Sequence, residues 1–235
     1  MEHFDLKFVL KQLPFTILYF SMGCIFGIVS GYSLFYTNKS LYEQILSLWF
    51  KRILFGLKFL NNQYIFWFIL NNFVAMVLIV TGSLLVLLTV FKRKRFVLYN
   101  KRFENIERHH PKMTVNSLFI IPIGAVFVNG FLISLFSTYV LLNSGYAELT
   151  NLISFLLPHG MNEILALLLA SSLGLSYVKI MKPLILKKRW NEAISVGKNM
   201  IFSKTTLYVL IFIAILVVFS GFIEGALTQL GLGKI

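Results

Sequence analysis

The sequence predicts an all-α membrane protein, a polytopic bundle of about five transmembrane helices. Of the 235 residues, 57% are hydrophobic and 13% are charged, whereas about 25% of the residues in soluble domains are charged. The mean hydropathy is +0.79. Several apolar runs also reach the length of about 20 residues that a helix needs to cross a bilayer.

These runs leave room for loops but not for a separate soluble domain, so residues 1–235 are expected to form a single integral membrane domain. The predicted spans, numbered in chain order, are residues 15–36, 64–91, 115–142, 160–180 and 206–230.

Residues 40–60 are predicted to form an interfacial amphipathic helix. Ser40 and Glu43 have the spacing of a capping box, which opens a helix. Lys51, Arg52 and Lys58 argue against a span, and Trp49 is a residue type that favours headgroup depth. The alternative is a water-exposed connector packed on the bundle.

A short broken or re-entrant element is expected before span four. Residues 151–157 are apolar but too short to cross a bilayer. Pro158 removes a backbone donor and Gly160 frees the backbone, so a helix break is predicted at these two residues. Residues 143–150 are predicted to be a loop, and a basic loop should follow span four.

Lysine and arginine are distributed unevenly between the two predicted sides of the membrane. The N-terminus and the loops after spans two and four hold 17 of these 22 residues, and the opposite side holds five. Cytoplasmic loops are enriched in such residues, so we expect the N-terminus in the cytoplasm and the C-terminus outside the cell membrane. Anionic lipids are then the expected partners of the basic loops, rather than nucleic acid.

Catalytic and metal-binding motifs are missing from the sequence. Cys24 is the only cysteine, which excludes an internal disulfide and a cysteine metal site. There is no zinc-protease or nucleotide-binding motif, and Ser171 and Ser172 have no histidine on their predicted layer. We therefore expect a protein that is not an enzyme and that uses no cofactor or metal.

Span one carries Gly23, Gly27 and Gly31 at four-residue spacing, which allows another helix to approach closely. Packing inside the monomer is the favoured interpretation, because every polytopic bundle needs such faces. A homodimer is the alternative.

Polar residues from several spans are predicted to meet at one depth in the outer half of the bundle. Ionisable groups are costly inside a bilayer and mark candidate functional sites there. The predicted polar cluster consists of His159, Glu163, Glu224, Asn71, Asn72 and Asn129. It has two interpretations: a water-accessible site for a proton, a cation or a small polar ligand, or a hydrogen-bonded structural clamp.

The segment around the predicted helix break resembles the signature of a known family. Leu157-Pro158-His159-Gly160 is followed by Glu163 and Ala166, with Gly174 later in the same span. This pattern is similar to that of the stage II sporulation protein M family of integral membrane proteins. Further similar elements, within residues 61–230, are Asn71-Asn72, Asn129-Gly130 and Glu224-Gly225, whereas Leu165 departs from the proline that the family often has.

The resemblance implies a polytopic membrane protein without known catalysis. The sporulation member of the family acts as a scaffold that places cell-wall hydrolases. The leading hypothesis is therefore a non-enzymatic membrane scaffold or assembly subunit with cell-envelope or membrane proteins as partners. The rival hypothesis is a transporter or channel for protons, cations or a small polar ligand that uses His159, Glu163 and Glu224.

Overall fold

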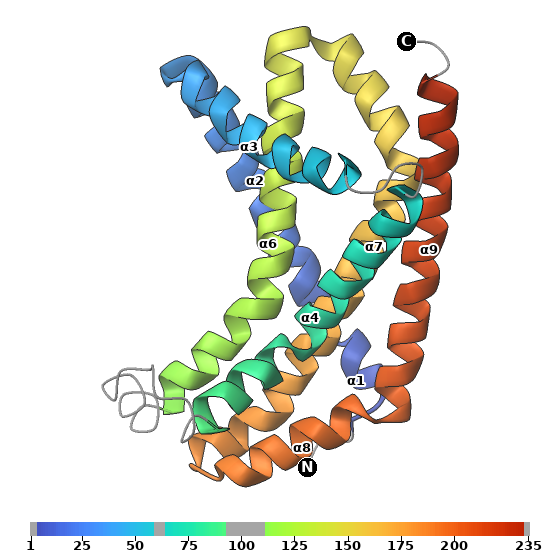
Figure 1. The fold of residues 1–235 in the computed structure, drawn as a ribbon. Coiled ribbons are helices and arrows are strands. Elements are labelled where there is room, and N and C mark those ends of the chain that lie inside the picture. The colour runs from blue at the N-terminus through green and yellow to red at the C-terminus, as the bar shows by residue number, and fades with distance from the viewer. Residues whose placement is uncertain (1–3, 59–63, 93–110, 233–235) are drawn as a thin grey trace. The chain divides into compact units, whose positions relative to one another are not determined.

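A computed structural model describes residues 4–58, 64–92 and 111–232, and within these ranges the chain forms eight α-helices (Figure 1). The predicted all-α fold class is confirmed. The helices are α1 (Leu6–Leu10), α2 (Leu13–Thr37), α3 (Lys39–Lys58), α4 (Tyr64–Lys92), α6 (Pro111–Ser144), α7 (Tyr146–Leu186), α8 (Trp190–Ile201) and α9 (Lys204–Leu232).

Five stretches of the described helices are long and apolar enough to cross a membrane, which confirms the predicted number. They are Leu6–Thr37, Ile69–Leu88, Pro111–Ser144, Gly160–Leu186 and Lys204–Ile223. The fourth differs from the others: 83% of its most apolar part is buried inside the protein, against 17% to 33% for the other four. Protein therefore surrounds most of this stretch of α7, while the other candidate spans keep much of their surface exposed, as contact with lipid would require.

The chain divides into two compact units, and each of the five long apolar helices contributes one part to each unit. Unit 1 comprises Met1–Thr16, Ala75–Ala125 and Leu167–Ile213. Unit 2 comprises Ile17–Val74, Val126–Ala166 and Ala214–Ile235.

In unit 2, the glycine ladder of α2 packs against α6 of the same chain. A methyl group placed on Gly23 would lie 2.1 Å from the carbonyl oxygen of Phe127, and one on Gly27 would lie 2.3 Å from that of Phe131. Gly31 meets the side chain of Thr138 in the same way. The ladder face is thus used within the monomer, as the favoured interpretation expected, and a homodimer would need another surface.

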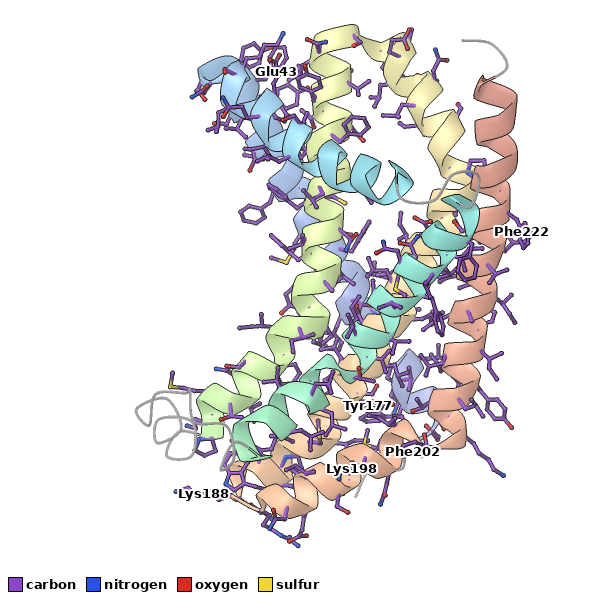
Figure 2. The ribbon with its side chains drawn as sticks, in the orientation of Figure 1. Glu43, Tyr177, Lys188, Lys198, Phe202 and Phe222 are labelled. Atoms are coloured by element: carbon purple, nitrogen blue, oxygen red, sulfur yellow. The ribbon has the colours of Figure 1, made fainter. Side chains whose placement is uncertain are left out.

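The helix predicted at residues 40–60 is confirmed as α3. Its position at the membrane interface stays a prediction. Its N-cap is not the predicted Ser40: the side-chain oxygen of Asn38 accepts a hydrogen bond from the backbone N–H of Leu41 at 3.0 Å. Asn38 precedes the first helical residue, where a capping side chain reaches unpaired N–H groups. Glu43, labelled in Figure 2, instead accepts a hydrogen bond from Tyr139 Oη at 3.3 Å.

A buried cluster in unit 2 fastens α3 to α6. Tyr42 and Leu46 of α3 are buried against Leu135 of α6. The Tyr42 hydroxyl donates to the Leu135 carbonyl oxygen, and burial raises the pKa of Tyr42 to about 12. Protein therefore covers Tyr42 and Leu46 in the first two turns of this helix.

The predicted loop at residues 143–150 and the break at Pro158 and Gly160 are both wrong. The chain turns at Gly145 alone, whose φ of +93° suits glycine, and α7 then runs through Pro158 and Gly160 without interruption. A proline removes only one helical hydrogen bond, and spans tolerate this because other groups satisfy the backbone. No short re-entrant element forms, since residues 151–157 belong to one 41-residue helix.

In unit 1, a serine side chain replaces a helical hydrogen bond that a proline cannot make. Pro122 lies inside α6 and has no N–H to donate to the carbonyl oxygen of Leu118, four residues earlier. Ser83 Oγ of α4 donates to that oxygen at 2.9 Å. The same proline lies close to α7, where a methyl group on Gly174 would approach its Cβ to 3.3 Å.

The expected basic loop after span four contains a helix, α8, so the prediction of a plain loop is wrong. Ala193, Gly197 and Met200 form its buried face. A methyl group on Gly197 would lie 2.7 Å from Leu84 Cδ1 and 2.8 Å from Met181 Sδ, both in unit 1. These small or apolar residues recur at helical spacing, but Lys198 lies among them and basic residues flank the helix on both sides, which obscured the pattern in the sequence.

Candidate functional site

The candidate site is a hydrogen-bonded carboxyl group in unit 2, where three helices meet. Asn72 Nδ2 of α4 donates to Glu163 Oε1 of α7 at 3.1 Å. Ser220 Oγ of α9 donates to the same oxygen at 3.0 Å. Glu163 and Asn72 are half-buried and Ser220 is fully buried.

Close packing of α9 on α4 explains why these side chains can meet. A methyl group on Gly221 would lie 2.4 Å from Cγ1 of Ile69. Ile69 precedes Asn72 by three residues and therefore lies on the same side of α4. The glycine lets the two helices approach, which brings Ser220 and Asn72 to one carboxyl group.

The site has hydrogen-bond donors for a carboxylate but no cation among the side chains that the structure describes. Among the described residues, an ion pair is found between Arg189 and Glu192, which belong to unit 1. Within a span, an ionised carboxyl group is costly unless it is paired or hydrated. The arrangement can therefore orient one carboxyl group and can accept a proton or a cation.

The structure brings together two of the six predicted cluster residues, Glu163 and Asn72. Asn71 and Asn129 are exposed. The side chains of His159 and Glu224 lie outside the described part, although both residues belong to helices. His159 precedes Glu163 by four residues, and Glu224 follows Ser220 by four, so both stay predicted neighbours of the site on helical spacing.

Sequence reasoning missed Ser220, which supplies one of the two donors. A serine in an apolar run is common in membrane helices because its hydroxyl can bond to its own backbone. The available signal was the pair of small residues Ser220-Gly221, four residues before Glu224. Such a pair marks a place where another helix comes close.

Sequence reasoning also missed a group of buried hydroxyls in unit 1. Thr16 Oγ1 and Ser172 Oγ lie 3.2 Å apart, and each also bonds to a carbonyl oxygen of its own helix. Tyr177 Oη and Thr206 Oγ1 lie 2.6 Å apart, and Thr206 donates to the Met200 carbonyl oxygen at 2.6 Å. These groups are neutral at physiological pH, so they join helices without carrying charge.

The described side chains contain no group of three or more histidine, cysteine, aspartate or glutamate residues that could hold a metal ion. Comparison with protein-family models, with known proteins and with solved structures finds no match. The five apolar helices define the class: this is a multi-pass helical membrane protein.

Proposed function

We propose that the chain is a non-enzymatic membrane scaffold or assembly subunit. The observation that carries the proposal is the position of Glu163, whose single oxygen Oε1 accepts hydrogen bonds from Asn72 and Ser220 on two other helices. Such an arrangement fixes α4, α7 and α9 against each other, which suits a rigid platform for other membrane proteins. The resemblance to the stage II sporulation protein M family agrees with this role.

The scaffold proposal predicts that assembly depends on hydrogen bonding at residue 163 and not on its charge. Glu163→Gln keeps an acceptor oxygen for both donors, whereas Glu163→Ala removes it. On native gels of solubilised membranes from expressing cells, the parent and Glu163→Gln should migrate in a complex larger than the purified chain. Glu163→Ala should lose that complex. Equal migration of all three at the size of the purified chain would contradict the proposal.

A transporter or channel for protons or cations is the second candidate. It is favoured by the same carboxyl group, because no described cation pairs with Glu163 inside its span. Proton and sodium flux should be measured in liposomes for the parent, Glu163→Gln and Glu224→Gln. A transporter predicts parent flux that disappears in the variants, whereas the scaffold proposal predicts no parent flux. Glu148→Gln is the matched control, since Glu148 is an exposed acid in the first turn of α7 and lies outside the site.

We further propose that the N-terminus faces the cytoplasm, on the distribution of lysine and arginine. Two exposed serines test this orientation in a background with Cys24 replaced by alanine: Ser40 in α3 and Ser195 in α8. A membrane-impermeant maleimide should label Ser40→Cys in intact cells. It should label Ser195→Cys only after permeabilisation, and the reverse pattern would overturn the orientation.

A further inference from the structure

In unit 1, α8 and the turn that follows it form a surface between the ends of α7 and α9. Residues 187–189 connect α7 to α8, and residues 202–203 connect α8 to α9. The first connection includes Lys188 with φ 58°. The candidate spans of α7 and α9 end and begin at these turns. If both helices cross the bilayer, the short connections would keep α8 at its boundary.

The orientation of α8 about its own axis is fixed by its buried face. Gly197 lies against Leu84 and Met181 so closely that a methyl group would not fit without movement. Ala193 and Met200 are buried beside it. The opposite face of α8 therefore points away from the rest of unit 1. Lys198 lies on that face and is exposed.

Phe202, in the turn after α8, is 87% exposed, the highest value among the large exposed hydrophobic side chains of the described residues. It stands two residues before Lys204, the first residue of the last candidate span. Lys198 and Lys204 flank it in sequence and are both exposed. Figure 2 shows Lys188, Lys198 and Phe202 along this connection between α7 and α9.

The chain segment that contains Phe202 carries mostly positive charge. Residues 182–204 contain six cations and one acid, Glu192. Glu192 already pairs with Arg189, whose Nε donates to it at 2.6 Å. The other exposed cations of this segment form no ion pair with an acid among the described residues; they are Lys182, Lys187, Lys188, Lys198 and Lys204.

We propose that the outer face of α8, with Phe202, Lys198 and Lys204, is a docking surface for the headgroups of anionic phospholipids. The two ammonium groups would face lipid phosphates while the phenyl ring enters the boundary between headgroups and acyl chains. Lipid is the occupant for two reasons. Short turns connect the surface directly to the candidate spans of α7 and α9, and the positive charge of the surface is opposite to that of anionic lipid. This inference does not depend on the proposed scaffold role.

The test places a single tryptophan at the surface. Trp49, Trp67 and Trp190 are replaced by phenylalanine, and Phe202→Trp is introduced. The protein is reconstituted in phosphatidylcholine and phosphatidylglycerol in equal parts, with bromine on the acyl chains of one lipid at a time. Brominated phosphatidylglycerol should quench roughly twofold to fivefold more than brominated phosphatidylcholine, given the usual attraction of a lysine to an anionic surface.

Phe222→Trp in the same background is the matched control, since Phe222 is 63% exposed on α9 and has no lysine or arginine within ten residues. Both brominated lipids should quench it equally. Lys198→Gln with Lys204→Gln should abolish the preference at position 202, and the two arginine substitutions should retain it. Equal quenching at position 202 in the parent background would overturn the proposal, as would no quenching, which indicates water or a protein partner there.

A second measurement tests the proposal if the chain with Trp49, Trp67 and Trp190 replaced does not fold. The melting temperature of the otherwise unchanged protein is compared in nanodiscs with and without phosphatidylglycerol. Stabilisation by the anionic lipid should be lost on Lys198→Gln with Lys204→Gln and kept with Lys39→Gln, which alters a lysine of unit 2. Loss in neither variant would also overturn the proposal.

Discussion

The two units of this protein join their helices by different chemistry. In unit 1, the polar contacts between helices are neutral hydroxyls, such as Ser83 on the carbonyl oxygen of Leu118 and Thr206 beside Tyr177. In unit 2, a neutral hydroxyl also joins two helices, at Tyr42 and Leu135, but most of the contacts described above are backbone against backbone at the glycines of α2 and α6, together with a carboxyl group that two helices contact through hydrogen bonds.

The two kinds of contact have different roles. Some supply a hydrogen bond that a backbone group lacks, whereas the contact at Glu163 involves a group that can gain or lose a proton. The Ser83 hydroxyl compensates for the N–H that Pro122 lacks, so it has a sufficient structural explanation. Glu163 replaces no missing backbone group, and a carboxyl group is a costly means of joining helices in a span. Unit 2 is therefore where functional experiments should begin.

Of four variants that test this difference, Gly130→Ala in unit 2 should have the largest effect on stability. The new methyl group would lie 2.4 Å from the carbonyl oxygen of Phe20, so α2 and α6 must separate. We expect a loss of about 3 kcal/mol in the free energy of unfolding, at the upper end of overpacking costs. Unfolding in mixed micelles measures it. Gly160→Ala is the control: nothing lies within 4 Å of its added methyl group, so the protein should be no less stable.

Glu163→Ala should have the next largest effect, because it leaves Asn72 and Ser220 without their shared acceptor. We expect a loss of about 2 kcal/mol, in the range for hydrogen bonds to a charged group. Glu163→Gln should retain most of that stability, since an amide oxygen accepts the same bonds. If both variants lose the same amount, the charge of residue 163 matters to the structure, and the contrast between the two units sharpens.

Ser83→Ala tests whether the hydroxyl of unit 1 replaces the missing proline donor. We expect a loss of about 1 kcal/mol, typical of a hydrogen bond. In a Pro122→Ala background, the restored N–H can reach the carbonyl oxygen of Leu118, and the same serine substitution should cost clearly less. A double-mutant cycle with no coupling between residues 83 and 122 would refute this explanation.

Thr206→Val should have the smallest effect, about 0.6 kcal/mol, the average for a hydrogen bond between membrane helices. It removes the contacts of Thr206 with Tyr177 and with the Met200 carbonyl oxygen. Thr205→Val provides the comparison at the neighbouring position. A loss as large as that of Glu163→Ala would mean that neutral hydroxyls and the carboxyl group contribute alike.

Much of the fold could be predicted, because hydropathy is a property of each segment alone. The five spans and the helix at α3 follow from runs of apolar residues and their interruptions. The break at Pro158 was predicted wrongly, because a local rule for proline does not include the surroundings that allow α7 to continue. The α8 helix was missed for a similar reason, since its apolar stripe is short and lies among lysines.

The candidate site could be predicted only in part. Glu163 and Asn72 stood out as polar residues in apolar runs, but so did Asn71 and Asn129, which are exposed. Adjacent residues of a helix point about 100° apart, so depth alone cannot choose between Asn71 and Asn72. Ser220 carried no charge that would have marked it.

A helical membrane protein with five apolar helices follows from composition and segment length, because these set the solvent that each segment requires. The choice of polar side chains that meet depends on how the helices pack. The rotation of each helix about its axis and the close approach at Gly221 bring Ser220, Asn72 and Glu163 together. Those features depend on contacts between residues distant in the chain, which no local pattern encodes.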